Sequence, residues 1–468
     1  MDMSLRHLKQ TVKAGTQERI DRQHAAQKST AREWIDILFD AGSFVETDTL
    51  RKDSHVVAGF GTVNMRPVCC FAQDYTSAGG AMTVSQSRKI EKILDTAALN
   101  GTPVVMMLDS AGVKVDEGVL GIRAYADIFK KLARISGVCP MVALVLGECR
   151  GSAVIMTQLS DFVIQGPKGR IALHGLQVMN AAKDDAFGPE TMAAQGVCSV
   201  TADSDEAAIR KAIEILDYLP SCSAEDALVN EGEDLNRLLT ADGSDASALI
   251  ADLADEGVYL ETGKGFGNAL RTALTRIGGR SVGIIACDRS VDDGRLDEAS
   301  CLKAARFARL CDCYHLPIIT LVDSEGAAVP GISGQGGLIK ALAGLSFTLV
   351  EATSPKMCVI TGKAVGASYA VLGAHGDYTL AWENALISPM TGEVGAAVLY
   401  DGDLSEGADR AELEKKYTAE MSAVNAAELA LIDEAVESRD TRKYLIAALE
   451  MYVSKRDANL PRKHADQP

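Results

Sequence analysis

The chain contains one sequence unit twice. The motif Asp-Ser-Ala-Gly at 109–112 recurs as Asp-Ser-Glu-Gly at 323–326, an offset of 214 residues (109 to 323). The same offset relates Arg66 and Arg280, Asp74 and Asp288, Gly80 and Gly294, Lys89 and Lys303, and Pro103 and Pro317. A register held over such a length indicates internal duplication. We therefore expect two copies of one fold, and one active site that uses a similar device from each copy.

Length and charge limit what the chain can be. A chain of 468 residues suggests two large domains, because single hydrophobic cores stop growing beyond about 250–300 residues. We expect a first domain over 1–245 and a second over 246–468, since residues 204–255 form an acidic, glycine-poor connector. The net charge of −17 excludes nucleic acid as the main partner, because no basic surplus is present to neutralise phosphates. A local Lys/Arg cluster could still hold a small anion.

The cysteines and apolar runs indicate the compartment. The eleven cysteines form no paired CxxC framework, so we expect buried free thiols in a reducing cytoplasm and no metal site. Residues 1–27 are charged and polar, unlike a secretory signal. No apolar run reaches about 18 residues, the length needed to span a bilayer. We expect a cytoplasmic protein, which would lie at a membrane only if partner subunits held it there.

Hydrophobic periodicity predicts the same order of elements in both copies. In the first copy we expect strands at 58–63, 68–72, 103–108, 141–146 and 162–164, and helices at 85–100 and 121–135. In the second we expect strands at 281–286, 318–322, 357–361 and 378–381, and helices at 300–314 and 338–345. Ahead of the first copy, Thr30 and Glu33 predict the capped start of a helix. Alternating strands and helices indicate an α/β protein.

Each copy also contains a strand that runs into a glycine-rich turn and a further helix. The turns cover 146–153, with Gly147, Gly151 and Ser152, and 361–368, with Gly366, Ala367 and Ser368. A helix start leaves backbone N–H groups without partners, and its dipole favours negative charge. Two adjacent N–H groups would form an oxyanion hole. The alternative is that each glycine only lets a helix pack closely on a sheet.

The turns at 109–112 and 323–326 lie at the ends of buried strands, where ligands of open α/β sheets bind. Ala111, Gly112 and Gly326 are therefore candidate substrate contacts, although ordinary turn chemistry explains the same residues. The sequence contains no GxSxG, HExxH or GxxxxGK[ST] motif. His174 and His315 are candidate bases, but a lone histidine is more often structural. The sequence thus favours backbone stabilisation of oxyanions over a side-chain base.

In combination, these residues resemble the carboxyltransferase subunits of biotin-dependent acyl-CoA carboxylases, and also the α subunits of sodium-pumping acyl-CoA decarboxylases. The resemblance runs from about residue 30 to residue 450. In the first half it rests on 30–33, 42–44, 61–63, Arg-Pro-Val at 66–68, Gln-Asp-Tyr-Thr at 73–76, 79–80, Ser-Ala-Gly at 110–112 and 117–118. In the second half it rests on 303–307, 311–312, 317, 322–323, 336–337, 355–356, 363–364, 369, 432–433 and Asp-Thr-Arg at 440–442.

The resemblance implies a tandem crotonase-like fold, the ββα superhelix of the ClpP/crotonase class. Acyl-CoA would bind mainly to the N-terminal half, and carboxybiotin to the C-terminal half of a neighbouring subunit. The implied reaction moves a carboxyl group between carboxybiotin and the α-carbon, or the vinylogous carbon, of a short acyl-CoA through a thioester enolate. Carboxybiotin releases CO2, the biotin ureido enolate removes the α-proton, and the new enolate attacks CO2. Both enolate oxygens need donors, which accounts for two oxyanion holes.

The resemblance also assigns residues. The N–H groups of Gly151 and Ser152 would serve the thioester oxygen, and those of Ala367 and Ser368 would serve biotin; which hole faces which ligand stays open. The implied substrate contacts are Ala111, Gly112, Gly147, Gly326, Gly336, Gly337, Gly366 and Ala370. Ala370 stands where the family selects acyl size. Ser152 and Ala367 stand where the family often has glycine.

The implied partners lie on other chains. Biotin is expected on a separate biotin carboxyl carrier protein, because Lys356-Met357 stands where the family has a plain turn before a strand. A biotin carboxylase or membrane decarboxylase subunits would complete the complex, and copies of this chain would form a dimer-based hexamer.

Alternatives to carboxylation stay open. The chain could be the α subunit of a sodium-translocating acyl-CoA decarboxylase, which runs the reverse transfer. It could be a biotin-independent crotonase-like hydratase, isomerase or hydrolase. It could also be a scaffold subunit that binds partners without turnover. Neither the acyl group nor the direction of transfer is determined by the sequence.

Overall fold

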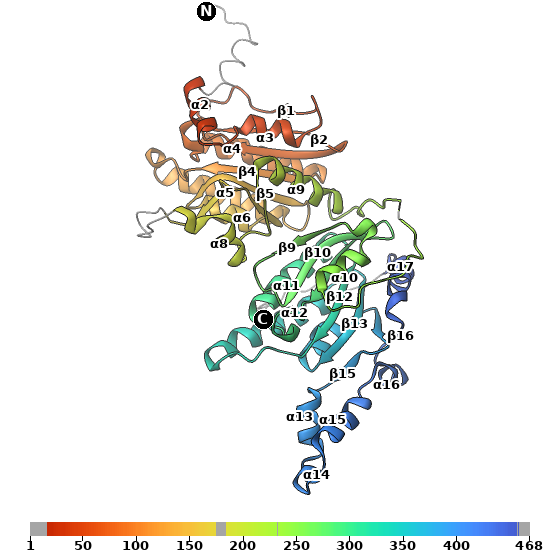
Figure 1. The fold of residues 1–468 in the computed structure, drawn as a ribbon. Coiled ribbons are helices and arrows are strands. Elements are labelled where there is room, and N and C mark those ends of the chain that lie inside the picture. The colour runs from red at the N-terminus through yellow and green to blue at the C-terminus, as the bar shows by residue number, and fades with distance from the viewer. Residues whose placement is uncertain (1–15, 175–183, 232, 456, 458–468) are drawn as a thin grey trace, which may run out of the picture. The chain divides into compact units, whose positions relative to one another are not determined.

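The chain folds as two compact units. The structure is a computed structural model that describes residues 16–174, 184–231, 233–455 and 457. The contacts between residues divide it into Met1–Asp226 and Ala227–Pro468, which run from red to yellow-green and from green to blue in Figure 1. Each unit contains one mixed eight-stranded sheet with helices, so the predicted duplication is confirmed. No helix within the described residues is long and apolar enough to cross a membrane.

The sheet of the first unit has the order β1-β2-β3-β4-β5-β6-β8, and β7 also pairs with β5. Its strands are β1 (Val45–Glu46), β2 (Val56–Val63), β3 (Arg66–Gln73), β4 (Val104–Ser110), β5 (Met141–Arg150), β6 (Phe162–Gln165), β7 (Arg170–Ala172) and β8 (Val200–Thr201). Its α-helices are α2 (Gln17–Ala25), α3 (Ala31–Leu38), α4 (Val84–Asn100), α5 (Val119–Ile135), α6 (Ala153–Gln158), α8 (Pro189–Ala194) and α9 (Asp205–Tyr218). Strands β1 to β3 pair antiparallel, and the remaining pairs are parallel.

The parallel strands are buried because helices pack on the sheet. Alternate residues such as Met106, Leu108 and Val145 join α4 and α5 in one apolar core. Helices α3 and α9 contact each other and strands of the same sheet. Every residue of β4 is therefore buried, which explains the continuous apolar run that predicted this strand. Thr30 and Glu33 form the predicted capping box at the start of α3.

The sheet of the second unit has the equivalent order β16-β14-β13-β12-β11-β10-β9, and β15 also pairs with β13. Its strands are β9 (Tyr259–Thr262), β10 (Leu270–Ile277), β11 (Arg280–Cys287), β12 (Ile318–Ser324), β13 (Lys356–Val365), β14 (Tyr378–Trp382), β15 (Leu386–Ser388) and β16 (Glu434–Val436). Its α-helices are α10 (Ala246–Leu253), α11 (Glu298–Cys313), α12 (Gln335–Glu351), α13 (Gly392–Leu399), α14 (Asp401–Ser405), α15 (Arg410–Ala419), α16 (Ala423–Glu428) and α17 (Thr441–Tyr452). Leu321, Val359 and Leu380 pack with residues of α10 and α17.

Strands β5 and β13 are longer than predicted. Glycine suggested turns after 146 and 361, but both strands continue through the glycine, to Arg150 and Val365. In each case the pairing with the neighbouring strand shifts register, and the extra residues then pair with β7 or β15. The helix expected after Gly366 is a single π-helical turn, Tyr369–Gly373.

Residues 233–245 belong by contact to the second unit. Arg237 donates to Asp252 Oδ1 of α10 (2.9 Å), and the N–H of Thr240 donates to the other oxygen of that carboxylate (2.5 Å). The N–H of Leu239 donates to the carbonyl of Arg439, just before α17 (2.8 Å). The boundary predicted at 245/246 falls inside this set of contacts, and the compact units divide at Asp226/Ala227.

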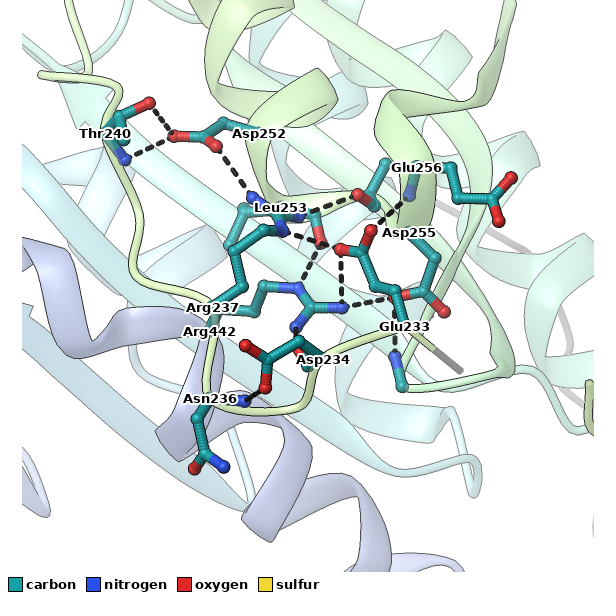
Figure 2. Close-up of polar contacts among 12 residues, drawn as sticks. Glu233, Asp234, Asn236, Arg237, Thr240, Asp252, Leu253, Asp255, Glu256 and Arg442 are labelled. Carbon is teal, nitrogen blue, oxygen red and sulfur yellow. Dashed lines mark hydrogen bonds and ion pairs between the residues drawn. The ribbon is translucent and has the colours of Figure 1, made fainter. Parts of the chain in front are cut away.

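Arg442 of α17 binds the start of this segment, at residues 233–234, through several polar contacts (Figure 2). Its side chain is fully buried, and its guanidinium pairs with Asp255 and with Glu233 Oε1 (3.1 Å). It also donates to the carbonyl of Asp234 (2.8 Å). Arg237 Nε shares the carboxylate of Glu233 at 2.6 Å. The tail helix is thus joined to the start of its own unit by charge-assisted hydrogen bonds.

Replacing Arg442 by methionine should lower the free energy of unfolding of the second unit by about 3–5 kcal/mol, because Asp255 and Glu233 lose a fully buried cationic partner. Arg439→Met is the matched control, since its side chain is 61% exposed, and it should cost less than about 0.5 kcal/mol. Urea unfolding followed by tryptophan fluorescence measures both, because Trp382 Nε1 donates to Thr441 Oγ1 beside Arg442 (2.8 Å). Equal stabilities for the two variants would contradict the assigned role.

Candidate active site

Each sheet carries an aspartate near the carboxyl end of a central strand, and each aspartate holds the main chain of the next strand. Asp109, near the end of β4, is fully buried, and its Oδ1 accepts a hydrogen bond from the N–H of Glu148 (2.8 Å). In the second unit, Asp323 Oδ1 accepts from the N–H of Lys363 (2.9 Å). Because these are matching positions of the two copies, the arrangement is itself duplicated.

Gly147 and Gly362 make room for these carboxylates. A Cβ atom on Gly147 would lie 2.1 Å from Asp109 Oδ1, and one on Gly362 would lie 2.4 Å from Asp323 Cγ. No other residue fits at either position without displacing the aspartate. Gly147 was predicted as a substrate contact, with close packing of a helix on the sheet as the alternative. The structure shows a third role, because the space beside Gly147 is filled by the Asp109 carboxylate.

Each aspartate has a cationic partner, which limits the cost of burying its charge. Lys28 Nζ lies 2.7 Å from Asp109 Oδ2, and Gln23 Nε2 donates to the same oxygen (3.1 Å). In the second unit, Arg289 Nη1 lies 3.2 Å from Asp323 Oδ1. Burial raises the pKa of the Asp109 carboxyl, and Lys28 acts against that rise.

The glycines of the two turns use their own N–H groups within the protein. Gly151 has φ +62°, and its N–H donates to the carbonyl of Ala172 at the end of β7 (3.1 Å). Gly366 has φ +52°, and its N–H donates to Ser388 at the end of β15 (2.8 Å). The prediction that Gly151 donates to an oxyanion is therefore corrected: the pairing of β5 with β7 extends one residue further and occupies this amide.

The amides that follow these glycines have no protein acceptor. In the described parts of the chain, no residue accepts a hydrogen bond from the N–H of Ser152 or Ala367, and both residues are partly exposed. Ser152 has helical angles, φ −63° and ψ −19°, and immediately precedes α6. Ser368 differs because it is buried, which makes its N–H less accessible to a ligand; its hydroxyl donates to the carbonyl of Val365 (2.9 Å). Ser152 and Ala367 are therefore the donors best placed for a ligand.

The turns at the strand ends are closed by internal hydrogen bonds. The N–H of Ala111 donates to the carbonyl of Gly79 (2.9 Å), and the N–H of Gly112 donates to Ser110 Oγ (3.2 Å). Gly326 makes the equivalent bond to its own turn serine (3.1 Å). Gly112 and Gly326 have φ +106° and +104°, which glycine adopts without strain. Turn chemistry therefore accounts for these amides, and none of the three is available to a substrate oxygen.

The other predicted contacts lie in different surroundings. Gly337 packs on Glu298, whose Oε2 would lie 2.1 Å from an added Cβ, whereas Gly336 is exposed with open space around it. Ala370 is also exposed. Of the two histidines considered as bases, His315 precedes β12, at the opposite end of the sheet from the turns.

A hollow of about 510 Å³ in the first unit was not predicted. Arg19, Arg22 and Lys28 bring three cations to it, and it extends to Gly79 and Glu148 beside the first turn. Both arginines belong to α2, which lies outside the duplicated unit. In the sequence, residues 1–27 are distinguished only by their charge and polarity, because α2 lacks an apolar stripe. The three-residue spacing of the arginines on one helical face is the signal that could have found the site.

Known proteins are similar to this chain along nearly its whole length. A family model described as the carboxyl transferase domain matches residues 22–466. The chain is 33% identical to the propionyl-CoA carboxylase beta chain of Saccharopolyspora erythraea, over 98% of this chain and 94% of that protein. It is 35% identical to the methylmalonyl-CoA decarboxylase subunit alpha of Veillonella parvula, over 98% of this chain and 96% of that protein.

A solved structure agrees with the fold. The crystal structure of transcarboxylase 12S, a hexamer with methylmalonyl-CoA and methylmalonic acid bound, has a TM-score of 0.94 and 32% identity. The match covers 99% of this chain and 97% of that chain, which confirms the predicted tandem crotonase-like fold. Sequence, duplicated sheets and structural match lead to one conclusion: the chain belongs to the carboxyl transferase domain family.

Proposed function

We propose that this protein is an acyl-CoA carboxyltransferase, which moves a carboxyl group between carboxybiotin and the α-carbon of a short acyl-CoA through a thioester enolate. Membership of the carboxyl transferase domain family supports the reaction type. The observation that carries the proposal is the pair of equivalent N–H groups at Ser152 and Ala367, neither bonded to any described residue. Preorganised donors of this kind stabilise the negative oxygen of an enolate.

The two donors would serve different oxygens. The N–H of Ser152 would donate to the thioester oxygen, and the N–H of Ala367 to the ureido oxygen of biotin. Biotin, bound on a separate carrier protein, supplies the carboxyl group and the base. Ala367 fits this ligand because its side chain is small, its position is partly exposed, and its amide lacks an acceptor among the described residues. Gly151 contributes its positive φ, which turns the chain from β5 toward Ser152.

The cationic hollow supports placing the acyl-CoA on the first unit. Coenzyme A carries negative phosphates, and Arg19, Arg22 and Lys28 face the hollow in a chain whose net charge is −17. The hollow reaches Glu148, on the segment that leads to Ser152. Transcarboxylase 12S was solved with methylmalonyl-CoA bound, so methylmalonyl- and propionyl-CoA are the first substrates to test.

The relatives support a proposal for the assembly and a second candidate direction of transfer. Transcarboxylase 12S is a hexamer within a multienzyme core, so we propose a hexamer of this chain that receives biotin from a carrier subunit. The reverse transfer is a second candidate, favoured by the 35% identity to a decarboxylase alpha subunit. In that case the carboxyl group would move from a malonyl-type CoA to biotin on a carrier of the decarboxylase complex.

The purified protein should exchange carboxyl groups between carboxybiotin and part of a panel of acetyl-, propionyl-, methylmalonyl-, malonyl- and glutaconyl-CoA. Chromatography of the CoA esters measures the exchange, with free biotin or a biotinylated carrier as the partner. Omitting biotin should abolish turnover, because no chain residue supplies the carboxyl group. Turnover without biotin would instead indicate a hydratase, isomerase or hydrolase. Tight CoA ester binding without exchange would indicate a scaffold.

Ser152→Pro should lower kcat about 10²–10³-fold, because it removes one oxyanion donor. Proline fits the backbone here, since Ser152 already has φ −63° and its N–H has no acceptor in the described chain. Ser152→Ala keeps the N–H and separates the role of the hydroxyl from that of the amide. Steady-state kinetics with the best substrate of the panel measures both. Unchanged kcat in a folded Ser152→Pro protein would remove this amide from the mechanism.

Replacing Arg19 and Arg22 together by alanine should raise the KM for acyl-CoA about tenfold, because charge-assisted contacts to phosphate are lost. An acyl-pantetheine substrate, which lacks the nucleotide phosphates, should show no such rise. Arg134→Ala, at an exposed position in the last turn of α5, is the matched control. Similar KM increases for both substrates would show that the two arginines do not contact the nucleotide.

A further inference from the structure

Both proposed donors follow strand segments that have left the regular ladder. Between Leu108 and Ser110 the pairing of β4 with β5 shifts register, from Val145 to Cys149 on β5. The second unit has the same shift, where Val322 pairs with Ile360 and Ser324 pairs with Ala364. Such bulges redirect a strand and leave main-chain groups without ladder partners.

A side-chain carboxylate replaces the missing ladder partner inside each bulge. The N–H of Glu148, which lies within the first bulge, donates to Asp109 Oδ1 (2.8 Å). The N–H of Lys363, within the second, donates to Asp323 Oδ1 (2.9 Å). Hydrogen bonds from N–H to a carboxylate are stronger than those to a neutral carbonyl, so the bulge is held more rigidly than ladder pairing would hold it.

The surroundings of Asp109 leave this carboxylate little freedom to move. The side chain is 0% exposed and lies against Gly147, where an added Cβ would be 2.1 Å from Oδ1. Lys28 and Gln23 bind the second oxygen at 2.7 and 3.1 Å. The main chain at 147–148 is thus clamped between β4 and the N-terminal segment of the same unit, directly before the Ser152 turn.

We propose that Asp109 and Asp323 are positioning residues for carboxyl transfer, which fix the direction of the Ser152 and Ala367 N–H groups by holding the bulges that precede them. This inference rests on the proposed function. Neither carboxylate needs to contact substrate. A small displacement of a donor from the developing oxyanion is enough to slow the reaction, since a misplacement of about 1 Å can cost about 10²-fold in rate.

Variants that displace the carboxylate without removing its charge give the sharpest test. Gly147→Ala and Gly362→Ala place a methyl group on the aspartate, and neither glycine has a positive φ, so alanine is compatible with the backbone. Asp323→Asn, at a side chain that is 13% exposed, instead weakens the hydrogen bond that Asp323 accepts from the N–H of Lys363. Gly402→Ala in α14 is the control, because its Cβ would meet nothing within 4 Å.

Folded Gly147→Ala and Gly362→Ala proteins should show kcat reduced about 10–100-fold. The KM for acyl-CoA should change little in Gly362→Ala, because Gly362 does not line the hollow that contains Lys28. The kcat of Asp323→Asn should also be lower than that of the wild type, and the kcat of Gly402→Ala should equal it. Circular dichroism and thermal unfolding identify the variants that are folded at the assay temperature. Folded variants with wild-type kcat would overturn the proposal. So would variants that all fail to fold, because the clamps would then serve folding alone.

Amide hydrogen exchange provides a readout that does not depend on activity. The peptide containing Glu148 should exchange faster in Gly147→Ala, and the peptide containing Lys363 faster in Gly362→Ala, because each N–H loses its acceptor. If the wild type exchanges no carboxyl group with any CoA ester, the proposed function fails and this measurement still reports on the clamp. Unchanged exchange at both peptides would overturn the clamp itself.

Discussion

The hydrogen bond from a main-chain N–H to an aspartate carboxylate on the neighbouring strand is the constraint on which both turns depend. Once Asp109 is buried, its charge needs a cation and its volume needs a residue without a side chain beside it. Lys28 meets the first need and Gly147 the second. This explains why the segment between α2 and α3, which lies outside the duplicated unit, reaches the centre of the first sheet. In the second unit, Arg289 lies on the loop after β11, so no such segment is required.

The two copies share the hydrogen bond from a main-chain N–H to an aspartate, but the charged side chains around it differ. Glu148 of the first unit corresponds to Lys363 of the second, and Ala111 corresponds to Glu325. Glu148 pairs with Arg150 (2.5 Å), whereas Lys363 Nζ pairs with Glu325 Oε1 (2.6 Å). The backbone amides have equivalent positions because both copies have the same fold, whereas the side chains at matching positions differ and can bind different ligands. This division matches a reaction in which two chemically different oxygens each need one donor.

Local patterns predicted the elements well, and long-range pairing explains most of what they missed. The apolar runs at 103–108 and 318–322 correspond to β4 and β12, because strands buried on both faces have a strong signal. Gly147 was taken to end a strand, since nothing local shows that Asp109 occupies the space of its side chain. The Gly151 amide was assigned to a ligand because its partner, Ala172 of β7, is paired only in three dimensions. Ser152 and Ala367 stay predicted donors because no described residue accepts a hydrogen bond from their N–H groups.

The contact between Asp109 and Gly147 has a consequence for how such a chain can change over generations. A side chain at 147 displaces the Asp109 carboxylate, and loss of that carboxylate leaves the Lys28 ammonium and the Glu148 N–H without their partner. Each single step is unfavourable, so divergence at this point requires several coordinated substitutions. The same reasoning applies to Asp323 and Gly362. We therefore expect drift between the two halves to concentrate elsewhere, so that these two pairs stay recognisable after most other traces of the duplication have been erased.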